Sequence, residues 1–188
     1  MRNAVFDWKN DPTGAVLAGM RINNQRSPLW TVCTVGDDHS RLENCVFRNF
    51  PWLDVASAEV VNCKFENCQR IQGREFQNCI FEHCSEVQSH GGHITDCTFD
   101  HLETLFINDT KMIGGCVHNS NCGTEFLISV EDSCLLGVAF ENVSLTHDAY
   151  MAIGLGKFHI ECCSFENCTT DRADERWFCR GDTRRGKV

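Results

Sequence analysis

The chain has 188 residues, 42% of them hydrophobic, which is enough apolar surface for one domain with a substantial core. Its formal net charge of −9 disfavours nucleic-acid binding, because phosphate contacts need a basic surface, and suits a protein partner with a basic surface instead. The N-terminus lacks the pattern of a signal peptide and no stretch has the length of a membrane span, so we expect a cytoplasmic protein with no membrane segment, while specialised export stays open.

The first part of the chain, residues 1–41, does not follow the repeat that comes after it. It contains two apolar runs, Ala15–Ala18 and Leu29–Cys33. The end coil of an open solenoid must be covered to prevent strand pairing at its edge. We therefore expect an N-terminal cap that includes one or two degenerate coils.

Residues 42–170 carry seven copies of a short motif, Cys-x-Phe, at spacings of 16 to 25 residues. The anchors are Cys45, Cys63, Cys79, Cys97, Cys116, Val138 and Cys163, and two residues after them stand Phe47, Phe65, Phe81, Phe99, His118, Phe140 and Phe165. A sequence repeat with a period near twenty residues is typical of a solenoid. Within each motif two inward side chains flank one outward side chain, which is the alternation of a β-strand. Because coil length varies, we predict a right-handed winding, as left-handed coils keep a strict hexapeptide pattern. The sequence thus predicts an all-β fold, a single right-handed parallel β-helix of about seven coils.

The corners between strands are also visible in the sequence. The residues before the anchors are Asn44, Asn62, Asn78, Asp96, Gly115, Gly137 and Cys162, and a second set, four residues after the anchors, is Asn49, Asn67, His83, His101, Ser120, Asn142 and Asn167. Most of them are residue types that readily take left-handed backbone angles. This corner role accounts for His83 and His101, which occupy the same corner one coil apart.

Two segments carry a resemblance to a known family. Residues Asn62–Cys68 and Cys163–Cys168 have a small residue two positions before a central Phe, and in this they resemble pentapeptide-repeat proteins. The resemblance covers about residues 42–170 and implies a right-handed, quadrilateral β-helix. Some members of that family are acidic rods that mimic DNA and bind enzymes that handle DNA.

The chain contains 14 cysteines, and most of them fall on the repeat. Cys45, Cys63, Cys79, Cys97 and Cys116 predict an inward ladder with steps of about 4.8 Å, the spacing of neighbouring strands. A ladder offers a line of thiols and not the converging ligands that zinc needs, so we favour free thiols packed in the core and expect no metal and no cofactor. Any redox or metal role belongs to the cysteines off the ladders, Cys33, Cys122, Cys134 and Cys179.

His90 and His93 are weak candidates for catalysis, and we name no catalytic residue with more support. They lie in the segment Ser89–His93, a Gly-containing bend outside both core positions. Pectin-degrading β-helix hydrolases carry a Gly-His-Gly box beside clustered aspartates, but no matching pair of aspartates stands near this bend. A surface loop is the favoured interpretation.

The outward position three residues after each anchor gives the main candidate binding surface. It reads Arg48, Glu66, Glu82, Asp100, Asn119, Glu141 and Glu166. Stacking in register would place Glu66, Glu82 and Asp100 one strand spacing apart, although like charges side by side cost stability. We expect Glu66, Glu82, Asp100, Glu141 and Glu166 to meet a basic partner or a cation, and the alternative is that they point into water.

Residues 171–188 are predicted to form a C-terminal cap and a basic tail. Trp177 and Phe178 would fold over the last coil, and the tail follows.

Three classes of function are compatible with the sequence. The preferred one is a non-enzymatic binding protein, of the inhibitor, immunity or effector type, that presents an acidic face to a partner. The others are a carbohydrate-active β-helix enzyme and a structural module of a larger assembly, and an end-to-end homodimer is open for any of them.

Overall fold

The structure is a computed structural model that describes residues 1–10, 21–24, 31–35, 40–55, 58–122, 128–131, 133–145, 152–153, 159–170 and 178–179. These residues form strands, turns and bends and contain no helix, so the all-β prediction is confirmed. Within the same residues, no helix has the length and apolar character that crossing a membrane requires.

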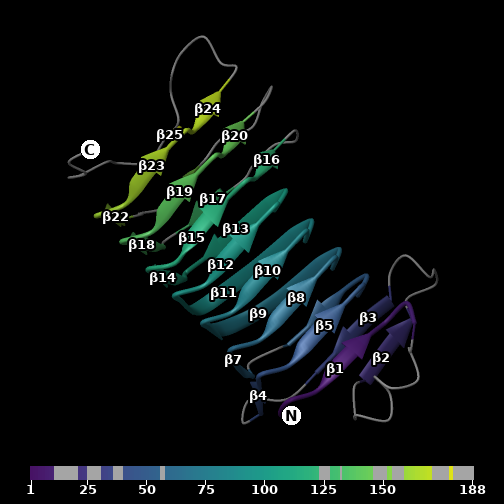
Figure 1. Ribbon diagram of the computed structural model, residues 1–188. Helices are drawn as coiled ribbons and strands as arrows, with labels where there is room; N and C mark the ends of the chain where they lie inside the picture. The colour runs from purple at the N-terminus through teal and green to yellow at the C-terminus, as the bar shows by residue number, and fades with distance from the viewer. Residues whose placement is uncertain are drawn as a thin grey trace.

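One wall of the solenoid, the front wall, is a sheet of eight strands stacked along the axis of the molecule (Figure 1). In order they are β1 (Val5–Asp7), β5 (Val46–Arg48), β8 (Lys64–Glu66), β10 (Ile80–Glu82), β12 (Thr98–Asp100), β15 (Cys116–His118), β19 (Ala139–Glu141) and β23 (Ser164–Glu166). Every neighbouring pair is parallel and in register, so each residue position forms a straight column along the axis.

A larger sheet of 14 strands forms the back wall. Its main path is β2 (Arg21–Asn24), β3 (Thr31–Thr34), β6 (Leu53–Asp54), β9 (Arg70–Gln77), β11 (Glu86–Thr95), β13 (Thr104–Asn108), β17 (Ile128–Glu131), β21 (Ala152–Ile153) and β25 (Phe178–Cys179). Beside that path run β4 (Arg41–Glu43), β7 (Glu59–Val61), β14 (Lys111–Ile113), β18 (Cys134–Leu136) and β22 (His159–Glu161). A small side wall holds β16 (Asn121–Cys122), β20 (Ser144–Leu145) and β24 (Thr169–Thr170).

The chain passes repeatedly from one wall to the next and returns to the front wall one coil further on, as Figure 1 shows. Among the described strands only β2 and β3 pair in the antiparallel sense. The predicted parallel β-solenoid is therefore confirmed, while its right-handed winding stays a prediction. The front wall has one strand more than the seven expected repeats, because β1 stacks on β5 and places Phe6 against Phe47.

The corners of the front wall consist of residues with positive φ, as the sequence predicts, except that the fifth repeat turns at Asn119 and not at Ser120. Before the strands these are Asn3, Asn44, Asn62, Asn78, Asp96, Gly114, Gly137 and Cys162, and after them Asn49, Asn67, His83, His101, Asn119, Asn142 and Asn167. The non-glycine residues among them have φ between 50° and 61°. Asn and Asp accept this conformation more readily than other side chains, so the repeated corner residue fixes where each strand begins and ends.

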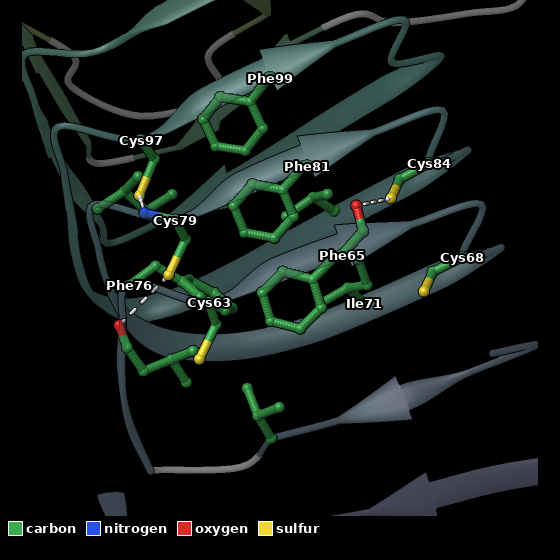
Figure 2. Packing of buried hydrophobic residues seen from close by; sticks show 14 of the residues in the cluster. Cys63, Phe65, Cys68, Ile71, Phe76, Cys79, Phe81, Cys84, Cys97 and Phe99 are labelled. Carbon is green, nitrogen blue, oxygen red and sulfur yellow. Dashed lines mark hydrogen bonds between the residues drawn. The ribbon is translucent and has the colours of Figure 1, made fainter. Parts of the chain in front are cut away.

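Phenylalanine fills the centre of the solenoid. Phe65, Phe81 and Phe99 stack face to face in successive coils, with ring centroids 4.8 Å apart at each step (Figure 2). Phe76 of the back wall meets the Phe81 ring edge-on at 5.4 Å. All four side chains are at most 1% exposed, so the stack joins the two walls into one core.

Two rows of thiols flank this stack, one on each side of the phenylalanine rings (Figure 2). Cys63 donates to the carbonyl of Val61 at 3.4 Å, and Cys68 donates to the carbonyl of Glu66 at 3.6 Å. In both rows the thiol donates to the carbonyl of the residue two positions earlier in the chain, so the hydrogen bond spans the left-handed corner residue. Cysteine thus fills a small interior space and also gives a buried carbonyl a donor.

The fifth repeat departs from the expected register by one residue. Gly115, and not Cys116, stands opposite Cys97, because Cys116 pairs with Thr98 and Val117 pairs with Phe99. The expectation that Cys116 belongs to the inward ladder is therefore wrong, since its thiol lies 3.7 Å from the Thr98 hydroxyl on the outer side of the sheet. A shift of one residue sends every side chain of a strand to the opposite face.

Several expectations fall outside the described residues. These are the apolar run Ala15–Ala18, Trp177 and the basic tail. The side chains of Cys122 and Cys179 are likewise not described.

Candidate functional site

The outward column of the front wall forms a continuous row of polar side chains, which we call the outer row. Its members, in spatial order, are Asp7, Arg48, Glu66, Glu82, Asp100, His118, Glu141 and Glu166. The predicted stacking of Glu66, Glu82 and Asp100 is confirmed, and so is that of Glu141 on Glu166. Asn119 is not a member, because the register of the fifth repeat places His118 in the row and Asn119 at the corner.

Two carboxylates in the first half of the row, Glu66 and Glu82, are paired with basic side chains, whereas Asp7 accepts hydrogen bonds from Asn10 and Asn49. Arg48 contacts Glu66, and Lys64 lies 2.8 Å from Glu66 and 2.9 Å from Glu82. Lys64 belongs to the neighbouring outward column, so its amino group bridges two successive coils. The expected unfavourable row of like charges is therefore offset in this half by interleaved cations.

These ion pairs change how the groups titrate. Hydrogen bonds from Lys64 and from Arg48 hold the pKa of the Glu66 carboxyl below its ordinary value. Hydrogen bonds to Glu66 and Glu82 raise the pKa of Lys64 in turn. Both groups stay charged across the neutral range, which fixes the charge pattern of this half of the row.

Asp100, at the centre of the row, is surrounded by neutral or titratable partners. Asn119 donates to its Oδ1 atom at 3.0 Å, and the Nδ1 atoms of His101 and His118 lie 2.9 and 3.7 Å from the same oxygen. Burial alone raises the pKa of Asp100, but the hydrogen bonds from Asn119 and His101 and the charges of both histidines leave it below its ordinary value. The sequence did not indicate His118 as a site residue, because the misplaced anchor of the fifth repeat assigned it to the core.

The last part of the row is the most exposed. Glu141 and Glu166 both point into solvent, and among the described residues no ion pair joins either carboxylate to a lysine or an arginine. At the corner beside them the side-chain amides form a chain of hydrogen bonds. Asn142 donates to Asn119 at 3.3 Å, and Asn167 donates to Asn142 at 3.2 Å. This part of the face therefore combines free acceptors with a rigid edge.

The second outward column of the front wall is mostly apolar or small. It consists of Val5, Val46, Lys64, Ile80, Thr98, Cys116, Ala139 and Ser164. Val5 is 62% exposed and Ile80 is 38% exposed. The front wall thus presents an acidic column beside an apolar one, a combination suited to a partner that offers both basic and apolar groups.

His90 and His93 lie on the back wall, away from the outer row, and both are exposed. The segment Ser89–His93 lies within strand β11, so the expectation of a surface loop is wrong, and the register between β9 and β11 shifts at this place in the strand. The ring of His90 packs on Phe106 with centroids 5.2 Å apart, whereas His93 lies 3.4 Å from Glu75. Each histidine has its own partner, and the geometry does not unite the two as an acid–base pair.

The thiols of the core are poorly placed for chemistry. Burial raises the pKa of Cys33 and of Cys63 to about 12, which leaves almost no thiolate at neutral pH. In the part of the chain that the structure describes, no three His, Cys, Asp or Glu side chains converge as metal ligands would. Cys162 is exposed, and its neighbour Cys163 donates to the carbonyl of Leu135 at 3.7 Å.

Comparisons with family models, with curated proteins and with solved structures give no match for this chain.

Proposed function

We propose that this protein is a non-enzymatic binding module whose front wall binds a basic segment of a partner protein. The observation that carries the proposal is the in-register outer row, in which carboxylates repeat at the strand spacing over successive coils. A flat, rigid row of this kind offers charge at fixed intervals, and fixed charges favour partner selection and fast association.

The charge distribution along the row supports contact in its second half. Arg48 and Lys64 balance Glu66 and Glu82, whereas Glu141 and Glu166 stand exposed beside the small side chains of Ala139 and Ser164. A basic side chain of the partner can approach these carboxylates without displacing an ion pair between described residues. Small neighbours also let the partner come close to the sheet.

The corner chemistry supports a finer description of the fold. Left-handed corners five residues apart, most of them followed by a small residue, are similar to the edges of pentapeptide-repeat proteins. We propose that the chain is a degenerate relative of that class. The buried, unpaired thiols further favour a reducing compartment such as the cytosol.

The test compares the wild-type protein with two charge-reversed variants of equal net charge. Glu141→Lys with Glu166→Lys reverses two stacked carboxylates of the outer row. Glu59→Lys with Glu75→Lys reverses two carboxylates that are also stacked in register, but on the back wall. Each protein is used for affinity capture from the native cell, and the dissociation constant of the captured partner is then measured with purified components.

We expect the outer-row variant to bind at least about tenfold more weakly and the back-wall variant to bind like the wild type. Equal binding by all three proteins would exclude the front wall as the contact surface. Recovery of nothing except the protein itself would favour a structural module that assembles from its own copies.

A further inference from the structure

Three histidines gather around the middle of the outer row. The rings of His83 and His101 lie in contact at successive corners, with centroids 4.5 Å apart. His101 contacts Asp100 at 2.9 Å, and His118 lies 3.7 Å from the same carboxylate oxygen. The Nε2 atom of His118 is covered and has no hydrogen-bond partner among the described residues. The cluster therefore places two imidazole rings beside the Asp100 carboxylate and a third, His83, against the ring of His101.

The charged groups that face this cluster come from every neighbouring strand. From β10 comes Glu82, which is adjacent to Asp100 in the row and is paired with Lys64 of β8. From β19 comes Glu141, which is adjacent to His118 in the row. The corner beside β15 contributes the neutral amide of Asn119, which donates to Asp100. Glu103 follows His101 along the chain and is exposed.

We propose that this cluster makes the affinity of the front wall for its basic partner depend on pH, with binding strong at neutral pH and weaker in mildly acidic conditions. The inference rests on the proposed function and concerns the regulation of the same surface.

The sign follows from which groups change charge. Imidazole is the side chain that ordinarily changes charge in mildly acidic conditions, so protonation of this cluster adds positive charge to the front wall. Asp100 and Glu66 keep their negative charge over this range, because the pKa of each lies below its ordinary value. The new charges cancel the acidic character of the row at Asp100 and repel a basic partner across its centre.

The geometry also links the protonation of these groups electrostatically. Two charged rings at the His83–His101 contact repel each other, whereas Asp100 attracts the charge on His101 and on His118. The cluster therefore behaves as a linked set and not as three independent groups.

The experiment uses an oligolysine peptide as the basic probe and measures its affinity at about pH 7.5 and about pH 5.5, on either side of histidine titration. The corner histidines are replaced as His83→Asn with His101→Asn, because the chain itself places Asn49, Asn67, Asn142 and Asn167 at the equivalent left-handed corners. A third change, His118→Gln, removes the last titratable ring.

For the wild type we expect the affinity to fall about tenfold between the two pH values, the scale of a few unit charges at short range in water. The double variant should show a smaller fall, and the triple variant almost none. If the triple variant keeps the full pH dependence, the histidine cluster is not its source and the proposal is overturned.

Two controls separate this proposal from the proposed function. The proposed function fails if the wild type does not bind oligolysine at neutral pH, or if Glu141→Lys with Glu166→Lys binds it equally well. The proposed regulation by pH then fails as well. If binding at neutral pH depends on the outer row but the affinity is unchanged in acid, only the proposed regulation by pH is overturned. NMR spectra of the imidazoles recorded at both pH values add an independent readout, and rings that gain no proton while the affinity falls would overturn the proposal.

Discussion

Each corner of the front wall combines two residues with complementary roles. A left-handed residue such as Asn62 turns the chain inward, and the small residue after it, Cys63, occupies the space inside the turn. The thiol then donates to the carbonyl two positions back. Ser120 replaces cysteine in one coil and donates to the carbonyl of His118 at 3.0 Å, so the donor and its small size matter more than the sulfur atom.

Gly115 should be the least replaceable glycine of the front wall. It has φ of +80°, and a Cβ atom there would lie 2.1 Å from the carbonyl oxygen of Cys97. Gly115→Ala must therefore move backbone, and we expect a loss of about 3 kcal/mol or more in the free energy of unfolding, measured with urea.

Gly137→Ala is the matched control for this substitution. Gly137 has φ of +63° but nothing within 4 Å of an added Cβ, so only the left-handed backbone opposes the change. We expect a loss of about 1 kcal/mol there. Equal losses in the two variants would contradict the close contact between Gly115 and Cys97.

Individual corner residues show which parts of the fold the sequence predicts and which it does not. The corner asparagines were predictable because few side chains accept their backbone angles. The adjacent pair Gly114 and Gly115 allows two registers, and Cys116 favoured the wrong one because cysteine anchors the other coils. The strand Val5–Asp7 was missed as a repeat since Ala4 replaces cysteine after the corner residue Asn3.

The strands of the front wall have only three residues each, so their stability comes from stacking on neighbours. Hydrogen bonds join each coil to the next, and the phenylalanine column extends the contact through the core. In such an array each coil is stabilised by the coils beside it. The free energy of unfolding that a core substitution removes therefore grows with the number of neighbouring side chains that the residue contacts.

Phe81→Ala should be among the most damaging changes to the core. Its ring stacks on Phe65 and Phe99 and also meets Phe76, and it is fully buried. We expect a loss of about 3–5 kcal/mol in the free energy of unfolding, from lost burial and the cavity left behind.

Phe6→Ala provides the comparison at the end of the same column. Phe6 is 9% exposed and stacks on Phe47 with centroids 5.4 Å apart. Urea denaturation should show a clearly smaller loss than for Phe81→Ala. A larger loss at Phe6 would mean that stability concentrates at the first coil and not along the stack.

At the element scale the sequence predicted the columns but not their ion pairs. Strand periodicity and repeat spacing are enough to align Glu66 with Glu82. The bridge from Lys64 depends on the neighbouring outward column and on side-chain reach, neither of which the repeat pattern contains. The acidic row therefore looked more uniformly charged in the sequence than it is in the folded chain.

Across the whole molecule, the solenoid turns a one-dimensional repeat into a surface with two parallel columns. The outer row carries most of the acidic charge of the front wall, and the column beside it is apolar or small except for Lys64. Carboxylates and histidines share contacts on this surface, so the proposed partner binding and its proposed dependence on pH concern the same residues. The sequence predicted the presence of the surface, but a partner's identity depends on chemistry outside the chain.

Glu66→Gln tests how the outer row contributes to stability in acid. The pKa of Glu66 is lowered on folding, so its contribution is present above the unfolded value near 4.5 and is lost as pH falls through the lower folded value. We expect the variant to be less stable by about 1 kcal/mol or less at neutral pH, with the difference vanishing once the pH lies below the folded-state pKa of Glu66.

Urea midpoints recorded as a function of pH measure this effect. Glu141→Gln serves as the control, because it removes the same charge without breaking an ion pair between described residues, and its midpoint should stay near that of the wild type at neutral pH. A Glu66→Gln deficit that persists unchanged in acid would show that lost packing, and not the ion pairs, causes it.

Recognition of a basic partner by the outer row is tested most directly by a charge swap. Once the partner is purified, its lysines and arginines are changed to glutamate one at a time, and each variant is titrated against the wild type and against Glu141→Lys with Glu166→Lys. We predict that at least one partner variant binds the wild-type protein poorly but regains affinity for the charge-reversed protein. If no partner variant regains affinity, and the reversed protein binds the unchanged partner as tightly as the wild type does, the outer row is not the surface that the partner contacts.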